Sequence, residues 1–398
     1  MIPLTLSAYT LVTANGRGIG AITRALRERH SGLRPCDFED VTLKTYIGRV
    51  RGLEDFSIEN GLERFDCRNN RLAWLGLQQD GFMVAVAEAK QRYGADRVGV
   101  IMGTSTSGIL ETEHAYRQRD AQTGSLPAWY ASRYRFTHNM FSVGHFVRTY
   151  LGLRGPALVI STACSSSAKV FATAARLIRT GLCDAAIVGG VDSLCQTTLY
   201  GFSSLQLLSP GPCRPCDEDR DGLSLGEAAG YALLESSDRV GRKGAVALLG
   251  YGESTDGYHM SHPHPEGAGA IRAMRQSLEQ AALKPTDIDY VNLHGTATRA
   301  NDSVEDKAVY SIFGGTVGCS STKGWTGHTL GAAGITEALI AALCLNQGFI
   351  PGTLNCERVD PSLRSRIMQR NEDRQIKRVL SNIFGFGGNN CSLVLGVL

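Results

Sequence analysis

The 398-residue sequence carries little net charge and has no block of charge of one sign. Its 41 Lys and Arg against 38 Asp and Glu leave a formal net charge of +3, which is too small and too evenly spread to predict a nucleic-acid or membrane partner. No window approaches the 18 apolar residues of a membrane span, and Met1 to Asn15 lacks a basic leader before an apolar core. We therefore expect a cytoplasmic protein.

Motifs for nucleotides and metals are also lacking. Gly16 to Gly20 lacks a full dinucleotide-binding pattern in a strand-turn-helix context. Cys213 and Cys216 form a single CxxC, and no second pair at zinc-ribbon spacing accompanies it. The 11 cysteines are an odd number in a long chain without an export signal, so most are expected to be reduced core residues. The sequence therefore predicts no metal, nucleotide or flavin.

Short apolar runs that end in Gly or Ser alternate with helical stretches, as expected of buried strands between helices. The predicted strands are Val98–Met102, Ala157–Ser161, Ala185–Val188 and Tyr231–Leu234. The predicted helices are Ser167–Arg179, Ala268–Ala282 and Glu337–Asn346. This alternation predicts an α/β protein with largely parallel sheets.

One order of elements occurs twice in the sequence. Ile160 to Thr180 runs from a strand end through a small-residue turn into a helix, and Gly318 to Leu345 repeats that order. Each segment is followed by a strand that enters a Gly-rich turn, at Gly189-Gly190 and at Gly385 to Gly388. The repetition predicts two similar halves with a tight interface. The predicted halves are residues 1–240 and 241–398.

Cys164 lies in a turn of small residues, Ser161 to Ser167, between an apolar strand and a helix. Such a turn places the thiol at a helix N-terminus, where unpaired N–H groups and the positive dipole end favour the thiolate. Small neighbours let a substrate approach the sulfur. The alternative is a buried structural cysteine, an interpretation that fits most of the other cysteines. Cys164 is therefore the candidate nucleophile.

Two histidines and a lysine lie in Gly- and Thr-rich turns. His294 follows a short apolar strand, Asp289 to Leu293, at the strand end where α/β sheets usually place ligands. Lys323 and His328 come just before a Gly/Ala-rich helix. A lone histidine is more often structural, but two in such turns, together with a candidate nucleophile, predict a catalytic group.

These motifs resemble those of the beta-ketoacyl-ACP synthases. Thr162 to Ser166 resembles the T-A-C-S-S turn of their nucleophile, His294 begins an H-G-T-x-T motif, and Lys323 to His328 matches K-x-x-x-G-H. The resemblance spans about residue 95 to the C-terminus. It implies that Cys164 takes an acyl group from acyl carrier protein (ACP) as a thioester, and that its backbone N–H forms part of an oxyanion hole.

The reaction of that family is a decarboxylative condensation. Loss of carbon dioxide from a malonyl thioester leaves negative charge on the thioester oxygen, which two neutral imidazoles could stabilise by donating N–H bonds. The resemblance assigns this role to His294 and His328, with Lys323 orienting the network and Glu337 supporting the second histidine. The hydroxyls expected to bind the phosphopantetheine arm are those of Thr296, Thr298 and Ser261.

A Gly-rich turn follows a further strand end, Asn382 to Phe384. Glycine flanks Phe386 on both sides, so that its ring could swing. In related synthases this phenylalanine gates the acyl pocket and its backbone N–H completes the oxyanion hole; we group Phe384, the other aromatic of the turn, with it. Asn389 replaces the usual Thr, which leaves the hydrogen bonding of the loop open.

The resemblance also implies a fold and partners. The family has the thiolase fold, a five-layered α-β-α-β-α arrangement of two pseudo-symmetric halves, which agrees with the repeated order of elements. ACP is the implied partner, and the chain is expected to form a homodimer or a heterodimer with a chain-length subunit. No cofactor is expected, because the substrates are thioesters on the phosphopantetheine of ACP and carry their own activation.

Three other assignments fit less well. A thiolase would need a second catalytic cysteine in the C-terminal Gly-rich turn, where this chain has Phe386 and, later, Cys391. The type III initiating synthases pair Cys with His and Asn, whereas His328 stands where that asparagine would be. A non-catalytic chain-length subunit would lack the nucleophile, whereas Cys164 is present.

The sequence leaves the pathway open. The unusual Glu111-Thr112-Glu113 favours a synthase of polyketide or polyene pigments, including the aryl polyene type, and primary fatty-acid elongation is the alternative. Because ACP is acidic, its docking surface should be basic. Arg68 and Arg71, one helical turn apart, are the candidates for that surface.

Overall fold

The structure, a computed structural model, describes residues 1–240 and 243–398 and contains a 12-stranded sheet. On one side its strands follow the order β6 (Ala157–Ile160), β5 (Val98–Gly103), β7 (Ala185–Asp192), β9 (Ala228–Ser236) and β1 (Leu4–Thr13). On the other side the order is β12 (Gly318–Ser320), β11 (Tyr290–Asn292), β16 (Arg378–Gly385), β17 (Asn389–Val397) and β10 (Val246–Thr255). When the five strands of each set are taken in chain order, the third (β6 or β12) lies at the outer edge of the set. The first (β1 or β10) lies at its inner edge, next to the other set. The predicted pseudo-symmetry is therefore confirmed.

Parallel and antiparallel pairs are mixed in this sheet. β5 pairs in parallel with β6 and β7, and β11 with β12 and β16. The pairs β7–β9, β9–β1, β16–β17 and β17–β10 are antiparallel, and β1 joins β10 in the same way. The expectation of largely parallel sheets is wrong, because a connection as short as Phe386–Gly388 can join only antiparallel neighbours.

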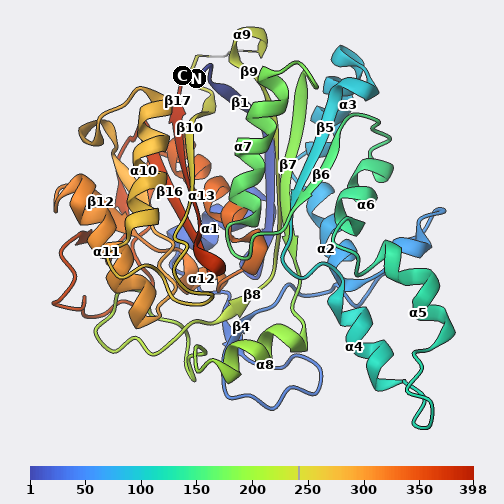
Figure 1. Cartoon of the computed structure of the whole chain (residues 1–398). Helices are drawn as coiled ribbons and strands as arrows, with labels where there is room; N and C mark the ends of the chain where they lie inside the picture. The colour runs from blue at the N-terminus through green and yellow to red at the C-terminus, as the bar shows by residue number, and fades with distance from the viewer. Residues whose placement is uncertain (241–242) are drawn as a thin grey trace.

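Two helices occupy the centre of the molecule and separate the two sets of strands (Figure 1). They are α7 (Ser166–Arg179) and α13 (Ala333–Gln347). They touch closely at Gly334, where an added Cβ would lie 2.3 Å from the backbone nitrogen of Ala168. This close packing accounts for the Gly/Ala-rich start of α13.

Outer helices cover the far faces and complete five layers. The C-terminal strands are covered by α10 (Ala268–Ala281) with α11 (Arg299–Phe313) against it, and the N-terminal strands by α2 (Arg68–Leu77), α3 (Phe82–Tyr93) and α6 (Ser142–Tyr150). The α-β-α-β-α arrangement of the thiolase fold is confirmed. The other helices and strands are β2 (Gly16–Arg17), α1 (Ile19–Arg27), β3 (Arg34–Pro35), β4 (Tyr46–Gly48), α4 (Ile109–Arg117), α5 (Ala128–Arg133), α8 (Gln196–Ser204), β8 (Leu225–Gly226), α9 (Ser237–Val240), α12 (Lys323–Thr326), β13 (Phe349–Ile350), β14 (Arg366–Ile367) and β15 (Glu372–Asp373).

The central helix α13 has an unexpected composition. With the turn before it, Leu330–Gln347 is long and apolar enough to cross a membrane, contrary to the expectation that no segment would be. However, 89% of this segment is buried inside the protein. Its apolar character reflects a helix enclosed on all sides by α7 and the strands.

Candidate active site

Cys164 lies in the turn between β6 and α7, just before the helix begins at Ser166. The preceding residue, Ala163, has φ of 52°, in the left-handed region that L residues rarely adopt. The Ser166 hydroxyl closes the turn by accepting the N–H of Thr162 at 2.9 Å and donating to the carbonyl of Ala163 at 2.5 Å. The thiol is 6% exposed. The turn thus holds the nucleophile candidate in a buried, fixed position.

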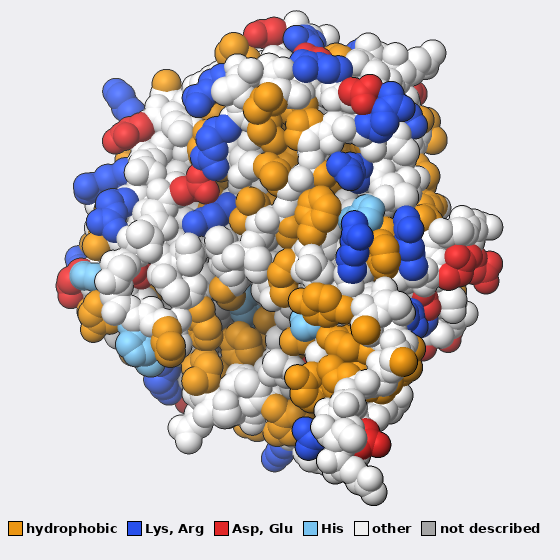
Figure 2. Space-filling model, turned by 45° about the vertical axis from the view of Figure 1, so that its right-hand side comes forward, with side chains coloured by type: hydrophobic (Ala, Val, Ile, Leu, Met, Phe, Trp, Pro, Cys, Tyr) orange, Lys and Arg blue, Asp and Glu red, His pale blue; other side chains and the backbone are white. Residues whose placement is uncertain are grey.

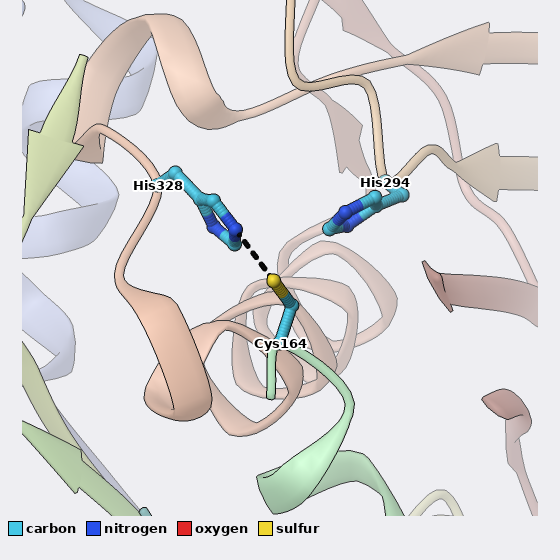
Figure 3. A group of neighbouring side chains, drawn as sticks. All are labelled: Cys164, His294 and His328. Atoms are coloured by element: carbon cyan, nitrogen blue, oxygen red, sulfur yellow. Dashed lines mark hydrogen bonds between the residues drawn. The ribbon is translucent and has the colours of Figure 1, made fainter. Parts of the chain in front are cut away.

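His294 and His328 face this sulfur from the C-terminal strands and loops (Figure 3). Nε2 of His328 lies 2.9 Å from Sγ of Cys164, and one ring nitrogen of each histidine lies within 4.8 Å of that sulfur and of the other. The two rings are nearly perpendicular, with centroids 5.4 Å apart. The structure therefore brings together the three residues that the sequence placed in separate turns.

Lys323 lies behind His294 and sets its protonation. Its Nζ is 3.3 Å from Nδ1 of His294, and it also binds the carbonyl oxygen of His294 and the carboxylate of Glu337. Because an ammonium group can only donate, Nδ1 of His294 must accept, which leaves the ring proton on Nε2. Glu337 reaches His294 through Lys323, whereas the expectation placed it in the network of His328.

Burial determines the protonation of the site at neutral pH. It lowers the pKa of both His294 and His328 well below 6.5, and the charge of Lys323 acts in the same direction, so both rings are neutral. Burial also raises the pKa of the Cys164 thiol to about 11, although Lys323 and the backbone N–H of Phe386 oppose this shift. The resting thiol is therefore protonated. The expectation of a thiolate is wrong for the resting state, because desolvation outweighs the favourable charges.

A second buried carboxylate positions the turn that carries His294. Glu305 of α11 accepts the N–H of His294 at 2.8 Å and that of Gly295 at 2.7 Å. Burial raises the pKa of Glu305 and of Glu337 to about 7. No sequence pattern pointed to Glu305, because only folding brings α11 close to the turn that carries His294.

We expect turnover to fall as the pH drops below about 7, because a protonated Glu305 loses acceptor capacity toward the two N–H groups. Stability should respond oppositely. Burial raises the pKa of Glu305 in the folded protein above its ordinary value of 4.5. The contribution of this carboxyl group to the free energy of unfolding is therefore complete below about pH 4.5 and is lost as the pH rises through about 7. Glu305→Gln should make the acid limb of the kcat profile shallower. An unchanged profile would contradict this role.

The aromatic residues of the C-terminal turn lie beside the site. Phe386 stacks on Phe202 of α8, with ring centroids 5.6 Å apart and an interplanar angle of 23°. Phe384 makes an edge contact with His294, at 6.3 Å between centroids. The side-chain oxygen of Asn389, the residue that replaces the usual Thr, accepts a hydrogen bond from Nζ of Lys169 at 3.2 Å. The ring of the gate candidate therefore packs against Phe202 in this structure.

A cavity of about 130 Å³ leads to Cys164 and both histidines. Figure 2 shows a hollow on this side of the molecule, bordered by hydrophobic side chains. Thr296, Thr298 and Ser261, whose hydroxyls are predicted to bind the phosphopantetheine arm, all line the cavity. The Thr298 hydroxyl also caps α11 by accepting the N–H of Asn301 at 3.4 Å, and it lies 2.9 Å from that of Thr296.

The structure contradicts one of the two proposed ACP-docking arginines, Arg68. Arg68 is 8% exposed and forms ion pairs with Glu227, which is fully buried, and with Glu54. Arg71 forms a two-bond pair with Asp66, at 2.6 Å for each bond. A buried, paired arginine such as Arg68 holds structure together. Arg71 is partly exposed, and its docking role stays a prediction. The helical spacing is correct, but Arg68 faces inward, which spacing alone cannot reveal.

Asp192, at the end of β7, was missed by the sequence analysis. Its carboxylate accepts bonds from backbone and hydroxyl groups of Thr104, Ser105 and Thr106, and from the N–H of Gly331 at 2.5 Å. It therefore ties the end of β5 to the segment that follows His328. Gly189-Gly190, just before it, was the only sequence signal.

The three candidate catalytic side chains also lie at distances that would suit the ligands of a metal ion. Among the described residues, Cys164, His294 and His328 offer one sulfur and two nitrogen atoms within 4.8 Å of one another. Cys213 and Cys216 are buried in the structure, and Cys213 donates to the carbonyl of Lys323 at 3.3 Å. The CxxC pair therefore packs beneath the site.

Family models match most of the chain. Residues 8–239 match the N-terminal domain of beta-ketoacyl synthase and residues 245–357 match its C-terminal domain. The mitochondrial 3-oxoacyl-[acyl-carrier-protein] synthase of Arabidopsis thaliana is 32% identical over 98% of this chain and 92% of its own length. The 3-oxoacyl-[acyl-carrier-protein] synthase 2 of Rhizobium meliloti is 40% identical over 61% of each chain.

Solved structures agree with this assignment. A chain of the Xenorhabdus doucetiae complex between the ketosynthase ApeO and its chain length factor ApeC superposes with a TM-score of 0.89 at 37% identity, covering 100% of this chain and 98% of that one. A beta-ketoacyl synthase from Burkholderia phymatum gives a TM-score of 0.87 at 28% identity, with 100% of both chains covered. The chain belongs to the beta-ketoacyl synthase family.

Proposed function

We propose that this chain is a beta-ketoacyl-ACP synthase that condenses an acyl group with malonyl-ACP in two steps. In the first, the sulfur of Cys164 attacks the thioester carbonyl of acyl-ACP. The carbon–sulfur bond to the phosphopantetheine breaks, and the thiol proton passes to the departing sulfur, so ACP leaves with a free thiol. His328, 2.9 Å from Sγ, is placed to relay this proton.

In the second step, malonyl-ACP loses carbon dioxide, and the carbon left behind attacks the acyl-Cys164 carbonyl. Negative charge develops on the malonyl thioester oxygen, to which His294 and His328 donate N–H bonds. The tautomer that Lys323 imposes on His294 supports this role. The intermediate expels the Cys164 sulfur, which is reprotonated, and beta-ketoacyl-ACP is released.

One observation carries this proposal: the thiol of Cys164 is enclosed by two neutral imidazoles and by backbone N–H groups. The N–H groups of Phe386 and of Cys164 itself are directed at the sulfur and partly offset the rise in its pKa that burial causes. We infer that the same two groups form the oxyanion hole for the tetrahedral intermediates, with Phe386 as the gate. A subunit that only measured chain length would have no use for this arrangement.

We place the enzyme in polyketide or polyene synthesis, with a chain-length subunit as its partner. The 37% identity to a chain of a ketosynthase–chain length factor complex over the whole length supports this choice. The sheet edge also supports a partner, since β6 ends the sheet and exposes Leu158 to 41%. Primary fatty-acid elongation by a homodimer is the alternative, favoured by the synthases of Arabidopsis and Rhizobium. We further propose that the protein acts in the cytoplasm on thioesters held by ACP phosphopantetheine, and that it needs no other cofactor.

The test is to incubate the protein, with and without its chain-length subunit, with a panel of acyl-ACPs and malonyl-ACP. Intact mass spectrometry should detect one acyl adduct, map it to Cys164 and identify beta-ketoacyl-ACP as the product. The preferred acyl group would separate pigment synthesis from fatty-acid elongation. Absence of both adduct and product from the two preparations would overturn the proposed activity.

A further inference from the structure

The ring of His328 lacks an anchor of the kind that His294 has. Lys323 binds Nδ1 of His294 at 3.3 Å, whereas Nδ1 of His328 is buried and bonds to no group among the described residues. No hydrogen bond to the other ring nitrogen therefore fixes the 2.9 Å contact between Nε2 of His328 and Sγ of Cys164. The direction of this ring depends on how firmly the backbone on either side of it is held.

The backbone of His328 is held directly on one side, by residues at the short strand β8. Its N–H donates to the carbonyl of Ser224 at 2.7 Å, and its carbonyl accepts the N–H of Gly226 at 3.0 Å. Two residues further on, Leu330 has φ of 55°, in the left-handed region that L residues rarely adopt. Such a conformation persists only where the surrounding contacts enforce it. The segment after His328 therefore needs a contact that holds it.

Asp192 supplies this contact from the end of β7. One of its carboxylate oxygens, Oδ2, accepts the N–H of Gly331, the residue after Leu330, at 2.5 Å. The fit is close, because a Cβ added to Gly331 would lie 2.6 Å from Oδ2 of Asp192 and 2.6 Å from the backbone nitrogen of Ser105. Asp192 is fully buried, and among the described residues the groups that donate to it are neutral N–H and hydroxyl groups. The carboxylate therefore acts as a hydrogen-bond acceptor that joins two segments.

We propose that Asp192 is a positioning residue for His328 and acts through the N–H of Gly331. It holds the strained turn at Leu330 and so keeps Nε2 of His328 against Sγ of Cys164. Asp192 is not among the described residues that line the active-site cavity, so it does not act on the substrate directly. Its effect on condensation rests on the proposed function, whereas its effect on the thiol of Cys164 does not.

The first test measures the reactivity of the thiol in the full-length Asp192→Asn and His328→Ala proteins. Asparagine replaces one acceptor oxygen by an NH₂ group, which cannot accept an N–H. We expect iodoacetamide to alkylate Cys164 about 10²-fold more slowly in both proteins than in the wild type, because a shift of about 1 Å in a reacting group can cost that factor. Peptide mass spectrometry would assign the adduct to Cys164, and circular dichroism would verify the fold. A wild-type rate in the folded Asp192→Asn protein would overturn the inference.

A double variant distinguishes positioning from a general loss of structure. If Asp192 acts only through His328, Asp192→Asn should cause no further loss in a protein that already carries His328→Ala. Losses that add in full would show that Asp192 acts by another route, and the inference would then be wrong.

Ser105→Ala is a milder variant of the same link. The Ser105 hydroxyl donates to Oδ2 of Asp192 at 2.7 Å and accepts the N–H of Gly331 at 3.2 Å. Its removal should slow alkylation of Cys164 in the same direction but less than Asp192→Asn does. If the Asp192→Asn protein does not fold, a wild-type rate in the Ser105→Ala protein would decide against the proposed role.

Asp217→Asn is the matched control. Asp217 is also a buried carboxylate, 3% exposed, and its Oδ2 accepts the N–H groups of Glu357 at 2.8 Å and Arg358 at 3.0 Å. It is not among the described residues that line the active-site cavity, so its replacement should leave alkylation unchanged. An equal loss in the Asp217→Asn protein would mean that any buried carboxylate has this effect, and the specific role of Asp192 would be refuted.

The second test uses acyl-ACP in place of iodoacetamide. Asp192→Asn should lower the maximal rate of acyl-adduct formation about 10²-fold and leave unchanged the acyl-ACP concentration that gives half of this rate. If the wild-type protein formed no acyl adduct, the proposed function would fail. The alkylation rates would still decide whether Asp192 positions His328.

Discussion

Cys164→Ala should abolish acyl-adduct formation and lower condensation by at least about 10³-fold, because no other cysteine among the residues that the structure describes lines the cavity. The variant should keep slow decarboxylation of malonyl-ACP, since His294 and His328 remain. Because the thiol is small and buried, the exchange adds no charge and little cavity, so the fold should persist. Intact mass and carbon dioxide release would measure the two activities separately.

The control for this change is Cys36→Ala. Cys36 is the one cysteine that is partly exposed rather than buried. It should form no adduct, and its replacement should leave turnover unchanged. An adduct on the Cys164→Ala protein, or full condensation by it, would show that the nucleophile has been assigned wrongly.

His294→Ala and His328→Ala should each lower condensation by about 10²–10⁴-fold, because each removes one N–H donor to the developing oxyanion. The two should differ in the first step. Only His328 contacts the sulfur, so His328→Ala should also slow acylation of Cys164, whereas His294→Ala should form the acyl adduct and stall there. Time courses of adduct mass and of carbon dioxide release would resolve the steps.

His114→Ala is a suitable control for the histidine series. His114 lies on α4 at the surface and pairs with Glu39 at 3.0 Å, away from the cavity. Its loss should change neither step. Wild-type decarboxylation by both the His294→Ala and the His328→Ala protein would contradict the assignment of the oxyanion donors.

The candidate catalytic residues were predictable from the sequence because each lies in a local pattern. A small-residue turn surrounds Cys164, and Gly- and Thr-rich turns carry His294 and His328. These patterns involve residues close together in the sequence, so they can be recognised without knowledge of the fold. The repeated order of strand, turn and helix gave the pseudo-symmetric architecture for the same reason. The boundary between halves near residue 240 remains a prediction.

The features that the sequence did not reveal depend on contacts between distant segments. Asp192 binds Thr104, which lies earlier in the sequence, and Gly331, which lies later, and no local sequence pattern predicts either contact. The inward direction of Arg68 depends on Glu227, which lies 159 residues away. The protonation of Cys164 likewise depends on how completely distant loops exclude water from it.

The protonated resting thiol has a consequence for the survival of the enzyme in air. Peroxide oxidises thiolates, not thiols, and burial raises the pKa of the Cys164 thiol to about 11. The ring of Phe386, stacked on Phe202, lies beside the same cavity. We therefore expect the idle enzyme to resist conversion of Cys164 to the sulfenic acid.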